Sequence, residues 1–352
     1  MRIHTWNRQN KKRKNTARCC MILALILGLA MGMTGSRTVW AEESAGQTEE
    51  KNVVRIGALV GPTAMGLVKL MDEAGQGTTK NRYEFADLMT EASAFTAPLL
   101  NGDLDIAALP ANLASVLYNK TDGGVKMLAV GVRSVLQIVA QGDEIGTIAD
   151  LKGAKLYATG QGATPEYVLR YLLSENGLNP DTDVEILWCA DTTEALARIQ
   201  NDPAAAAMLP QPFATAACAK TEGLHTVLDL GEEWDRLENG CSIVTGVMAV
   251  RTAFAEEHPD LVEAFLDEYR ASVEYAETDP AGAAALIEKF GILGSAAVAE
   301  KALPSCSLVC LTGKEGKDAL SGYLEILYDQ DPASVGGSVP EDDFYLAAGA
   351  AD

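Results

Sequence analysis

From residue 53 onward, short runs of apolar and β-branched residues alternate with segments of helical periodicity. The clearest unit begins with a strand-like run at 53–60, turns at a Gly-Pro-Thr sequence and continues as an amphipathic helix over 64–72. Repetition of this order predicts an α/β fold with crossover helices between parallel strands. Further strands are expected at 83–90, 104–109, 125–132, 135–140, 155–157, 184–189, 204–209, 226–230 and 243–250, and the main helices at 91–101, 111–118, 166–176, 259–277, 280–289 and 316–328.

The order of these elements predicts two lobes. A second set of strands and helices is inserted in the first, giving lobe I as 53–140 plus 245–352 and lobe II as 141–244. Each lobe is expected to be a mainly parallel sheet flanked by helices. Two strands near 135–142 and 243–250 would join the lobes as a hinge, and the cleft between the lobes is then the expected ligand site.

The first residues have the order of a secretory signal peptide. A basic cluster at 11–14 precedes an apolar stretch at 21–31, and the small residues Val39 and Ala41 follow. The apolar stretch is shorter than the roughly 20 residues of a membrane span. We therefore expect a signal peptide over 1–41, cleaved near Ala41, with an uncleaved anchor as the alternative, and export to the periplasm or the outer cell surface.

After this segment the chain becomes strongly acidic. Residues 42–52 are polar and read as a flexible leader. Residues 42–352 keep 20 of the 28 basic residues and all 49 acidic ones, a net charge of −29. Such a charge repels phosphate backbones, so we expect no nucleic-acid partner. The acidity itself is read as a solubility feature.

Cysteine and histidine positions give little sign of metal or redox chemistry. Cys19 and Cys20 precede the apolar stretch, so they do not support a lipid anchor. The five later cysteines are unevenly spaced, which argues against a disulfide framework. Either no disulfide forms, or a single one joins Cys306 to Cys310. His225 and His258 lie near no cysteine pair, and we expect neither a metal nor another cofactor. The five cysteines are Cys189, Cys218, Cys241, Cys306 and Cys310.

The sequence contains no recognisable catalytic constellation. The two histidines belong to no triad, and the carboxylate pairs at 256–257 and 341–343 look like solvated ends. The run 160–164 lacks the third glycine of a dinucleotide fingerprint, and 61–67 lacks the Lys-Ser/Thr of a P-loop. We therefore expect a binding protein and not an enzyme.

Candidate binding residues lie where predicted strands run into helices. Helix N-termini at such junctions offer free N–H groups and a positive dipole end to ligand oxygens. Ordinary caps and turns are the alternative interpretation of each junction. The candidates are Gly61, Pro62, Thr63, Ala64, Pro110, Asn112, Gly160, Gln161, Gly162, Thr164, Gln211 and Thr245.

Aromatic residues and cations near these junctions bear on the ligand class. Tyr167, Trp188 and Phe213 could stack on a flat ligand or belong to the core. Lys155 and Arg133 are the cations nearest in sequence to the candidate loops. A planar solute or one with a single anionic group therefore fits better than a phosphate with several charges.

The mature chain resembles the solute-binding proteins of ABC importers, in the nitrate/sulfonate/bicarbonate and thiamine-pyrimidine-precursor group. The resemblance implies capture of a small solute between two lobes, delivery to an ABC permease with its ATPase, contact with the membrane only through that permease, and a monomer. An enzyme on the same fold, of dehydratase or pyrimidine-precursor type, and a ligand-sensing domain are the alternatives. The resemblance rests on VRIGALVGPTAMGLVKLM (54–71), LLNGDLDIAALPANLASVLYNK (99–120), LKGAKLYATGQGATPEYVLRYLLSENGL (151–178), AAAAMLPQPFATAA (204–217) and IVTGVMAVRTAFAEEHPDLVEAFLDEY (243–269).

Two departures from that group qualify what the resemblance implies. The lipid-anchor cysteine expected in a single-membrane bacterium is missing, which puts the mode of attachment in doubt. The Cys-rich motif of the eukaryotic pyrimidine-precursor enzymes is also missing, which argues against synthesis of the pyrimidine by this chain.

Overall fold

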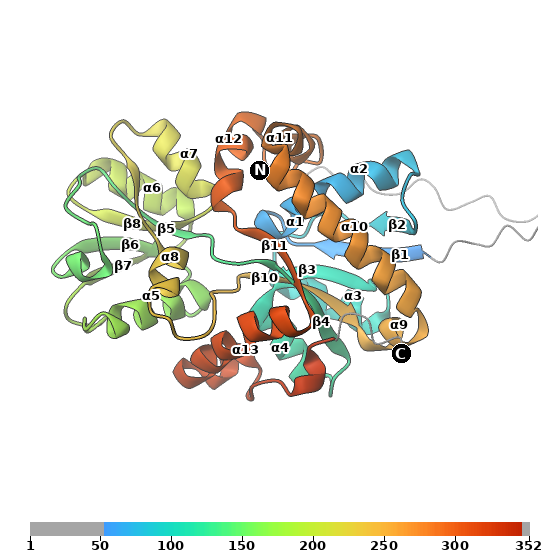
Figure 1. Ribbon diagram of the computed structural model, residues 1–352. Helices are drawn as coiled ribbons and strands as arrows, with labels where there is room; N and C mark the ends of the chain where they lie inside the picture. The colour runs from blue at the N-terminus through green and yellow to red at the C-terminus, as the bar shows by residue number, and fades with distance from the viewer. Residues whose placement is uncertain (1–52, 347–352) are drawn as a thin grey trace, which may run out of the picture. The chain divides into compact units, whose positions relative to one another are not determined.

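The computed structural model describes residues 53–346, which contain two mixed sheets with helices packed around them (Figure 1). The expected signal peptide, its cleavage point near Ala41 and the leader at 42–52 lie outside the described residues, as do 347–352. Within 53–346 no helix combines the length and the apolar character needed to cross a membrane.

The first sheet has six strands in the order β11-β4-β10-β3-β1-β2. Strand β1 pairs in parallel with β2 and β3, whereas β10 runs antiparallel to both β3 and β4, and β11 antiparallel to β4. We refer to this sheet and the helices packed on it as the six-stranded lobe. Its strands are β1 (Val53–Ala58), β2 (Arg82–Phe85), β3 (Ile106–Pro110), β4 (Val125–Val132), β10 (Gly246–Arg251) and β11 (Leu308–Thr312).

The second sheet has five strands in the order β7-β6-β8-β5-β9. Strand β6 pairs in parallel with β7 and β8, and β5 runs antiparallel to β8 and β9. This sheet and its helices, green to yellow in Figure 1, form the five-stranded lobe. Its strands are β5 (Leu136–Ala140), β6 (Lys155–Thr159), β7 (Glu185–Cys189), β8 (Ala206–Pro210) and β9 (His225–Asp229).

The sheets confirm an α/β fold in which most strands of each sheet point the same way, with β10 and β11 as the exceptions in the first sheet and β5 in the second. Parallel neighbours need a crossover that returns the chain to the starting edge of the sheet. Strands β5 and β10 instead enter directly from the other sheet, so no helix returns the chain and both run antiparallel to their neighbours. The strand-helix pattern alone gave no sign of this change in direction.

Alternating residues of the central strands point to opposite faces of the six-stranded sheet. In β3, Ala107 and Leu109 join one buried cluster, whereas Ile106 and Ala108 join the other. The first cluster packs against α4 and α13, and the second against α2 and α10, so helices cover both faces. This period-two pattern is the one that a strand buried on both sides requires.

The predicted helices are present, with changes near the N-terminal end of the described chain, whereas α8 (Leu230–Asp235), α12 (Ala296–Ala302) and strand β11 were not predicted. The expected helix at 64–72 is divided at Gly66 into α1 (Pro62–Met65) and α2 (Val68–Gln76). A Cβ at Gly66 would lie 3.1 Å from the Tyr269 hydroxyl of α10, so glycine there allows a close helix approach. The expected strand at 83–90 ends at Phe85, and the expected helix at 91–101 is the 3₁₀ turn η1 (Ala92–Phe95) followed by α3 (Thr96–Asn101).

The remaining helical elements lie between the strands up to β10, after which α9 to η3 follow one another without a strand until β11. They are α4 (Ala111–Lys120), η2 (Ile148–Leu151), α5 (Thr164–Glu175), α6 (Thr192–Asn201), α7 (Phe213–Lys220), α8 (Leu230–Asp235), α9 (Thr252–Glu257), α10 (Pro259–Thr278), α11 (Pro280–Lys289), α12 (Ala296–Ala302), η3 (Leu303–Ser305), α13 (Gly313–Gln330), η4 (Pro332–Val335) and η5 (Asp342–Phe344).

Two short segments carry the chain between the sheets. Residues 133–135 connect β4 to β5, and residues 236–245 connect α8 to β10. We call these two segments the hinge. The sequence placed 136–140 in lobe I, but β5 hydrogen-bonds only with β8 and β9 among the described strands, within the five-stranded sheet.

Candidate functional site

A cavity of about 530 Å³ is lined by residues of both lobes. Four strand-to-helix loops contribute to it: β1–α1 and β3–α4 from the six-stranded lobe, and β6–α5 and β8–α7 from the five-stranded lobe. Residues of the hinge complete the lining. The lining residues are Leu59, Val60, Gly61, Pro62, Thr63, Ala92, Pro110, Asn112, Leu113, Val116, Val132, Val135, Leu136, Ala163, Thr164, Pro165, Pro210, Gln211, Pro212, Phe213, Ile243 and Thr245.

The β1–α1 loop places three of its four candidates at the cavity. Gly61 has φ 113°, a conformation that favours glycine, and Pro62 opens α1. The Thr63 hydroxyl donates to the Leu59 carbonyl at 2.7 Å, so its hydrogen is already used. Ala64 is fully buried in the core and does not line the cavity.

At the β3–α4 loop, two donors are committed to the protein itself. The Ala111 N–H donates to the Thr245 carbonyl at 3.1 Å, which ties the start of α4 to the hinge. The Asn112 side-chain amide donates to the Ser334 carbonyl at 3.1 Å. Pro110, Asn112 and Thr245 line the cavity as expected, but the Ala111 N–H, the Thr245 N–H and the Asn112 side-chain amide already have partners.

The β6–α5 loop brings only Thr164 of its four candidates to the cavity. Gly160 and Gly162 adopt positive φ angles of 85° and 71° and shape the turn. The Gly162 N–H donates to the Glu166 carboxylate at 2.7 Å. Gly160, Gln161 and Gly162 do not line the cavity, so the structure favours the turn interpretation for them.

The β8–α7 loop contributes a buried amide and an exposed ring. Gln211 is only 3% exposed, and its backbone N–H donates to the Val135 carbonyl at 2.8 Å. Its Oε1 accepts from the N–H and the hydroxyl of Thr215, at 3.3 and 2.9 Å. Among the described residues, its Nε2 has no hydrogen-bond partner, which leaves one donor at the cavity wall.

Of the three aromatic candidates, only Phe213 lines the cavity, where it is half exposed. Trp188 and Tyr167 pack against the core. The sequence interpretation missed the apolar walls formed by residues such as Leu113, Val116 and Leu136. No sequence signal separates such residues from the core, but the prolines that follow several strands could have indicated Pro165, Pro210 and Pro212.

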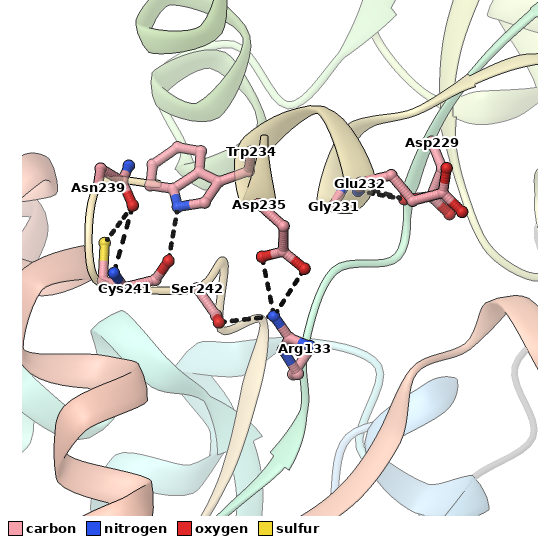
Figure 2. A network of polar contacts seen from close by, with 9 residues as sticks. All are labelled: Arg133, Asp229, Gly231, Glu232, Trp234, Asp235, Asn239, Cys241 and Ser242. Carbon is pink, nitrogen blue, oxygen red and sulfur yellow. Dashed lines mark hydrogen bonds and ion pairs between the residues drawn. The ribbon is translucent and has the colours of Figure 1, made fainter. Parts of the chain in front are cut away.

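Polar contacts fasten the two hinge segments to each other (Figure 2). Arg133 Nη2 donates to both Asp235 carboxylate oxygens, at 2.9 and 3.0 Å, and to the Ser242 hydroxyl at 2.6 Å. The Trp234 indole N–H donates to the Cys241 carbonyl at 3.2 Å. We call the Arg133–Asp235–Ser242 group the hinge clasp.

A carboxylate beside the hinge is held in an unusual environment. Asp229 accepts from the N–H groups of Gly231 and Glu232, at 2.8 and 3.3 Å, and from Gln137 Nε2 at 2.7 Å. Burial nevertheless raises the pKa of Asp229 above its usual value.

The cysteines of the described residues are free, and Cys306 and Cys310 do not form the bridge that the sequence left open. Burial raises the pKa of Cys306 to about 12 and that of Cys310 to about 11. Such thiols are poor nucleophiles and belong to the packing of the six-stranded lobe.

Comparison with known proteins gives the family. The sequence model of the NMT1-like family matches residues 65–290. This chain belongs to the NMT1-like family. The match covers most of both lobes, including three of the four cavity loops but not the β1–α1 loop, and it confirms the family resemblance predicted from the sequence. None of the curated proteins matches this NMT1-like chain significantly.

Solved structures share the fold of this NMT1-like protein. An ABC transporter structure from Parabacteroides distasonis is 25% identical, with a TM-score of 0.70 over 84% of this chain and 98% of that one. The periplasmic aliphatic sulphonate-binding protein of Escherichia coli is 18% identical, with a TM-score of 0.65 over 81% and 90%. A ligand-binding component of an ABC-type import system from Staphylococcus aureus is also 18% identical, with a TM-score of 0.61 over 84% and 97%. The two-lobed solute-binding fold is therefore confirmed.

Proposed function

We propose that the protein is the exported solute-binding component of an ABC importer. It captures one small organic molecule between its lobes and delivers it to a permease. The observation that carries the proposal is the cavity of about 530 Å³, which strand-to-helix loops of both lobes line together. Its volume lies within the roughly 300–1,000 Å³ of small-molecule sites. A hinge of two segments allows the lobes to close on the solute.

The chemistry of the cavity favours binding over catalysis. Among the described residues, none that lines it is a histidine, a cysteine or a charged residue. General acid–base and nucleophilic mechanisms need such groups within reach of the substrate. Thr63, the most buried hydroxyl of the lining, is already hydrogen-bonded to Leu59 and has no neighbouring base in the lining to activate it. An enzyme on this fold is therefore the weaker candidate.

The cellular setting belongs to the same proposal. The signal-like sequence at 1–41 would export the chain, and the mature protein would act as a monomer outside the cytoplasmic membrane. Its partners are the solute and an ABC permease with its ATPase, and it meets the membrane only through the permease. Similarity in fold to the binding component of a Staphylococcus aureus import system supports this assignment.

Native mass spectrometry of the purified mature protein tests the proposal. We expect one small molecule per chain, released unchanged on unfolding, and a smaller radius of gyration in X-ray scattering when it is added back. Chemical conversion of the bound molecule would indicate an enzyme instead. Absence of any solute-dependent closure would also contradict the transport role.

A matched pair of variants locates the bound molecule. Phe213 is 50% exposed and lines the cavity, whereas Leu100 is 51% exposed and lies outside it on α3. Phe213→Ala should weaken solute binding by about 1–3 kcal/mol, because a buried aromatic contact is lost. Leu100→Ala should leave the affinity unchanged, and equal effects would place the solute elsewhere.

A further inference from the structure

Within 53–346, no charged side chain lines the cavity, and the two nearest cations in sequence are already paired. Arg133 donates to Asp235 in the hinge clasp, and Lys155 Nζ lies 2.8 Å from an Asp202 oxygen. Neither Arg133 nor Lys155 lines the cavity. An anion entering the cavity would lose its hydration without gaining an ion pair, which is unfavourable.

Proline removes N–H donors at the start of all four helices that open onto the cavity. Anion sites at helix N-termini depend on backbone N–H groups that point at the ligand. Proline has no N–H. These prolines are Pro62 at the start of α1, Pro110 before α4, Pro165 at the second position of α5 and Pro212 before α7, and Pro210 also lines the cavity.

Several of the remaining N–H groups near these loops bond to the protein itself. Ala111 donates to the Thr245 carbonyl, and Thr215 donates to Gln211 Oε1. At the start of α5, Gly162 donates to the Glu166 carboxylate. That carboxylate also pairs with Arg170 at 2.7 Å and does not line the cavity, so it keeps the Gly162 N–H from a ligand.

Apolar walls and a few neutral polar groups then define what the cavity can hold. Leucine, valine and proline side chains and the Phe213 ring form most of the lining. Among the described residues, Gln211 Nε2 and the hydroxyls of Thr164 and Thr245 have no hydrogen-bond partner. A ligand can therefore place an uncharged acceptor, such as a carbonyl or ether oxygen or a ring nitrogen, against Gln211.

From these observations we propose that the solute is an uncharged, mainly apolar organic molecule with a hydrogen-bond acceptor that meets Gln211, and not a sulfonate, a carboxylate or a phosphate. This inference rests on the proposed function and narrows it, because the sequence alone also allowed a singly charged anion.

Two dyes with the same aromatic skeleton test the charge preference. N-phenyl-1-naphthylamine is uncharged, and 8-anilino-1-naphthalenesulfonate adds one sulfonate to it. Fluorescence titration of the mature protein should show one site that binds the uncharged dye at least about tenfold more tightly, a difference of about 1.4 kcal/mol. Equal or tighter binding of the sulfonate at that site would overturn the proposal, as would no binding of the uncharged dye.

A charge introduced into the cavity provides the matched control. Val116 lines the cavity and is only partly buried, so Val116→Lys should fold and should reverse the preference in favour of the sulfonate. Leu100→Lys adds the same charge outside the cavity and should leave both affinities as they are. A Val116→Lys protein with the wild-type preference would show that the dyes bind elsewhere and would overturn the proposal.

The solute released in native mass spectrometry separates this inference from the proposed function. A co-purified anion that closes the lobes would overturn the inference and leave the transport role intact. Preference for the uncharged dye, together with an uncharged bound molecule that the protein converts to a product, would keep the inference and remove the transport role.

Discussion

Gly160 and Gly162 have similar backbone angles but different surroundings. A Cβ at Gly160 would lie 2.7 Å from a carbon of the Pro165 ring, whereas a Cβ at Gly162 would meet nothing within 4 Å. We expect Gly162→Ala to cost about 1–2 kcal/mol of stability from its positive φ alone. Gly160→Ala should cost a further 1–3 kcal/mol or so, because the Pro165 contact cannot be relieved easily. Urea unfolding measures both, and equal losses would show that Pro165 moves freely.

Two aspartates should give opposite pH dependences at the residue scale. Burial raises the pKa of Asp229, so the folded state binds its proton more tightly and this site loses stability as the pH rises above about 3.8. The hydrogen bond from Lys155 lowers the pKa of Asp202, so this site has its stabilisation above about 3.8 and loses it as the pH falls through the lowered pKa. As the pH rises from 3 to 7, the stability of Asp229→Asn relative to wild type should therefore increase, and that of Asp202→Asn should decrease.

Urea unfolding of the three proteins at several pH values measures these slopes. Each variant also changes hydrogen bonds, which shifts its free energy of unfolding by a nearly constant amount at every pH. The informative quantity is therefore the slope, against pH, of the difference in free energy of unfolding between variant and wild type. If this difference had the same sign of slope for both variants, the assigned environments of Asp229 and Asp202 would be wrong.

At the scale of elements, the sequence predicted β4 residue for residue, because its long apolar run is bounded by Gly123-Gly124 and by Arg133. Strand direction was not predictable. Whether β10 pairs with β3 in parallel depends on which sheet the chain leaves, and a local pattern does not contain that information.

The candidate site was predictable to a similar degree. Glycine and proline residues at the strand-to-helix junctions indicated the loops, and this signal identified Thr63 and Gln211. Contacts such as Asn112 to Ser334, 222 residues apart in the chain, decide which donors remain free, and only the folded structure shows them. The apolar walls were missed because a valine beside a cavity and a valine in the core look the same in sequence.

The hinge clasp leads to a prediction at this scale. Arg133 joins the segment 133–135 to Ser242 of the segment 236–245 and to Asp235 at the end of α8. Arg133→Met should accelerate amide hydrogen exchange in 236–245, while costing less than about 1 kcal/mol in stability, because both charged partners are partly exposed.

Arg198 provides the control for this experiment. It pairs with Glu194 within α6 and touches neither hinge segment, so Arg198→Met should leave exchange in 236–245 unchanged. Identical exchange in the wild type and in Arg133→Met would show that the clasp does not restrain the hinge.

For the whole molecule, hydrogen bonds between the two lobes hold them in the arrangement of this structure. Tyr167 of α5 in the five-stranded lobe donates its hydroxyl to Asp331, which follows α13 of the six-stranded lobe, at 2.8 Å. Gln330 Nε2 donates to the Tyr167 carbonyl at 3.1 Å. Burial, with Asp331 beside it, raises the pKa of Tyr167 to about 12, so this hydroxyl keeps its proton under ordinary conditions.

Tyr167→Phe keeps the ring and removes only this bond between the lobes. We expect the solute-free variant to have a larger radius of gyration, and its affinity for the solute to fall about five- to fifteenfold, which corresponds to the 1–1.5 kcal/mol of a typical hydrogen bond. The affinity falls because a larger share of the molecules must first close, although the cavity itself is unchanged.

Tyr118→Phe removes a bond of the same kind, to Asp343, but within the six-stranded lobe. Since that bond does not join the lobes, Tyr118→Phe should leave the affinity and the radius as they are. Equal effects of the two variants would mean that the Tyr167–Asp331 bond stabilises the fold and not the closed arrangement of the lobes.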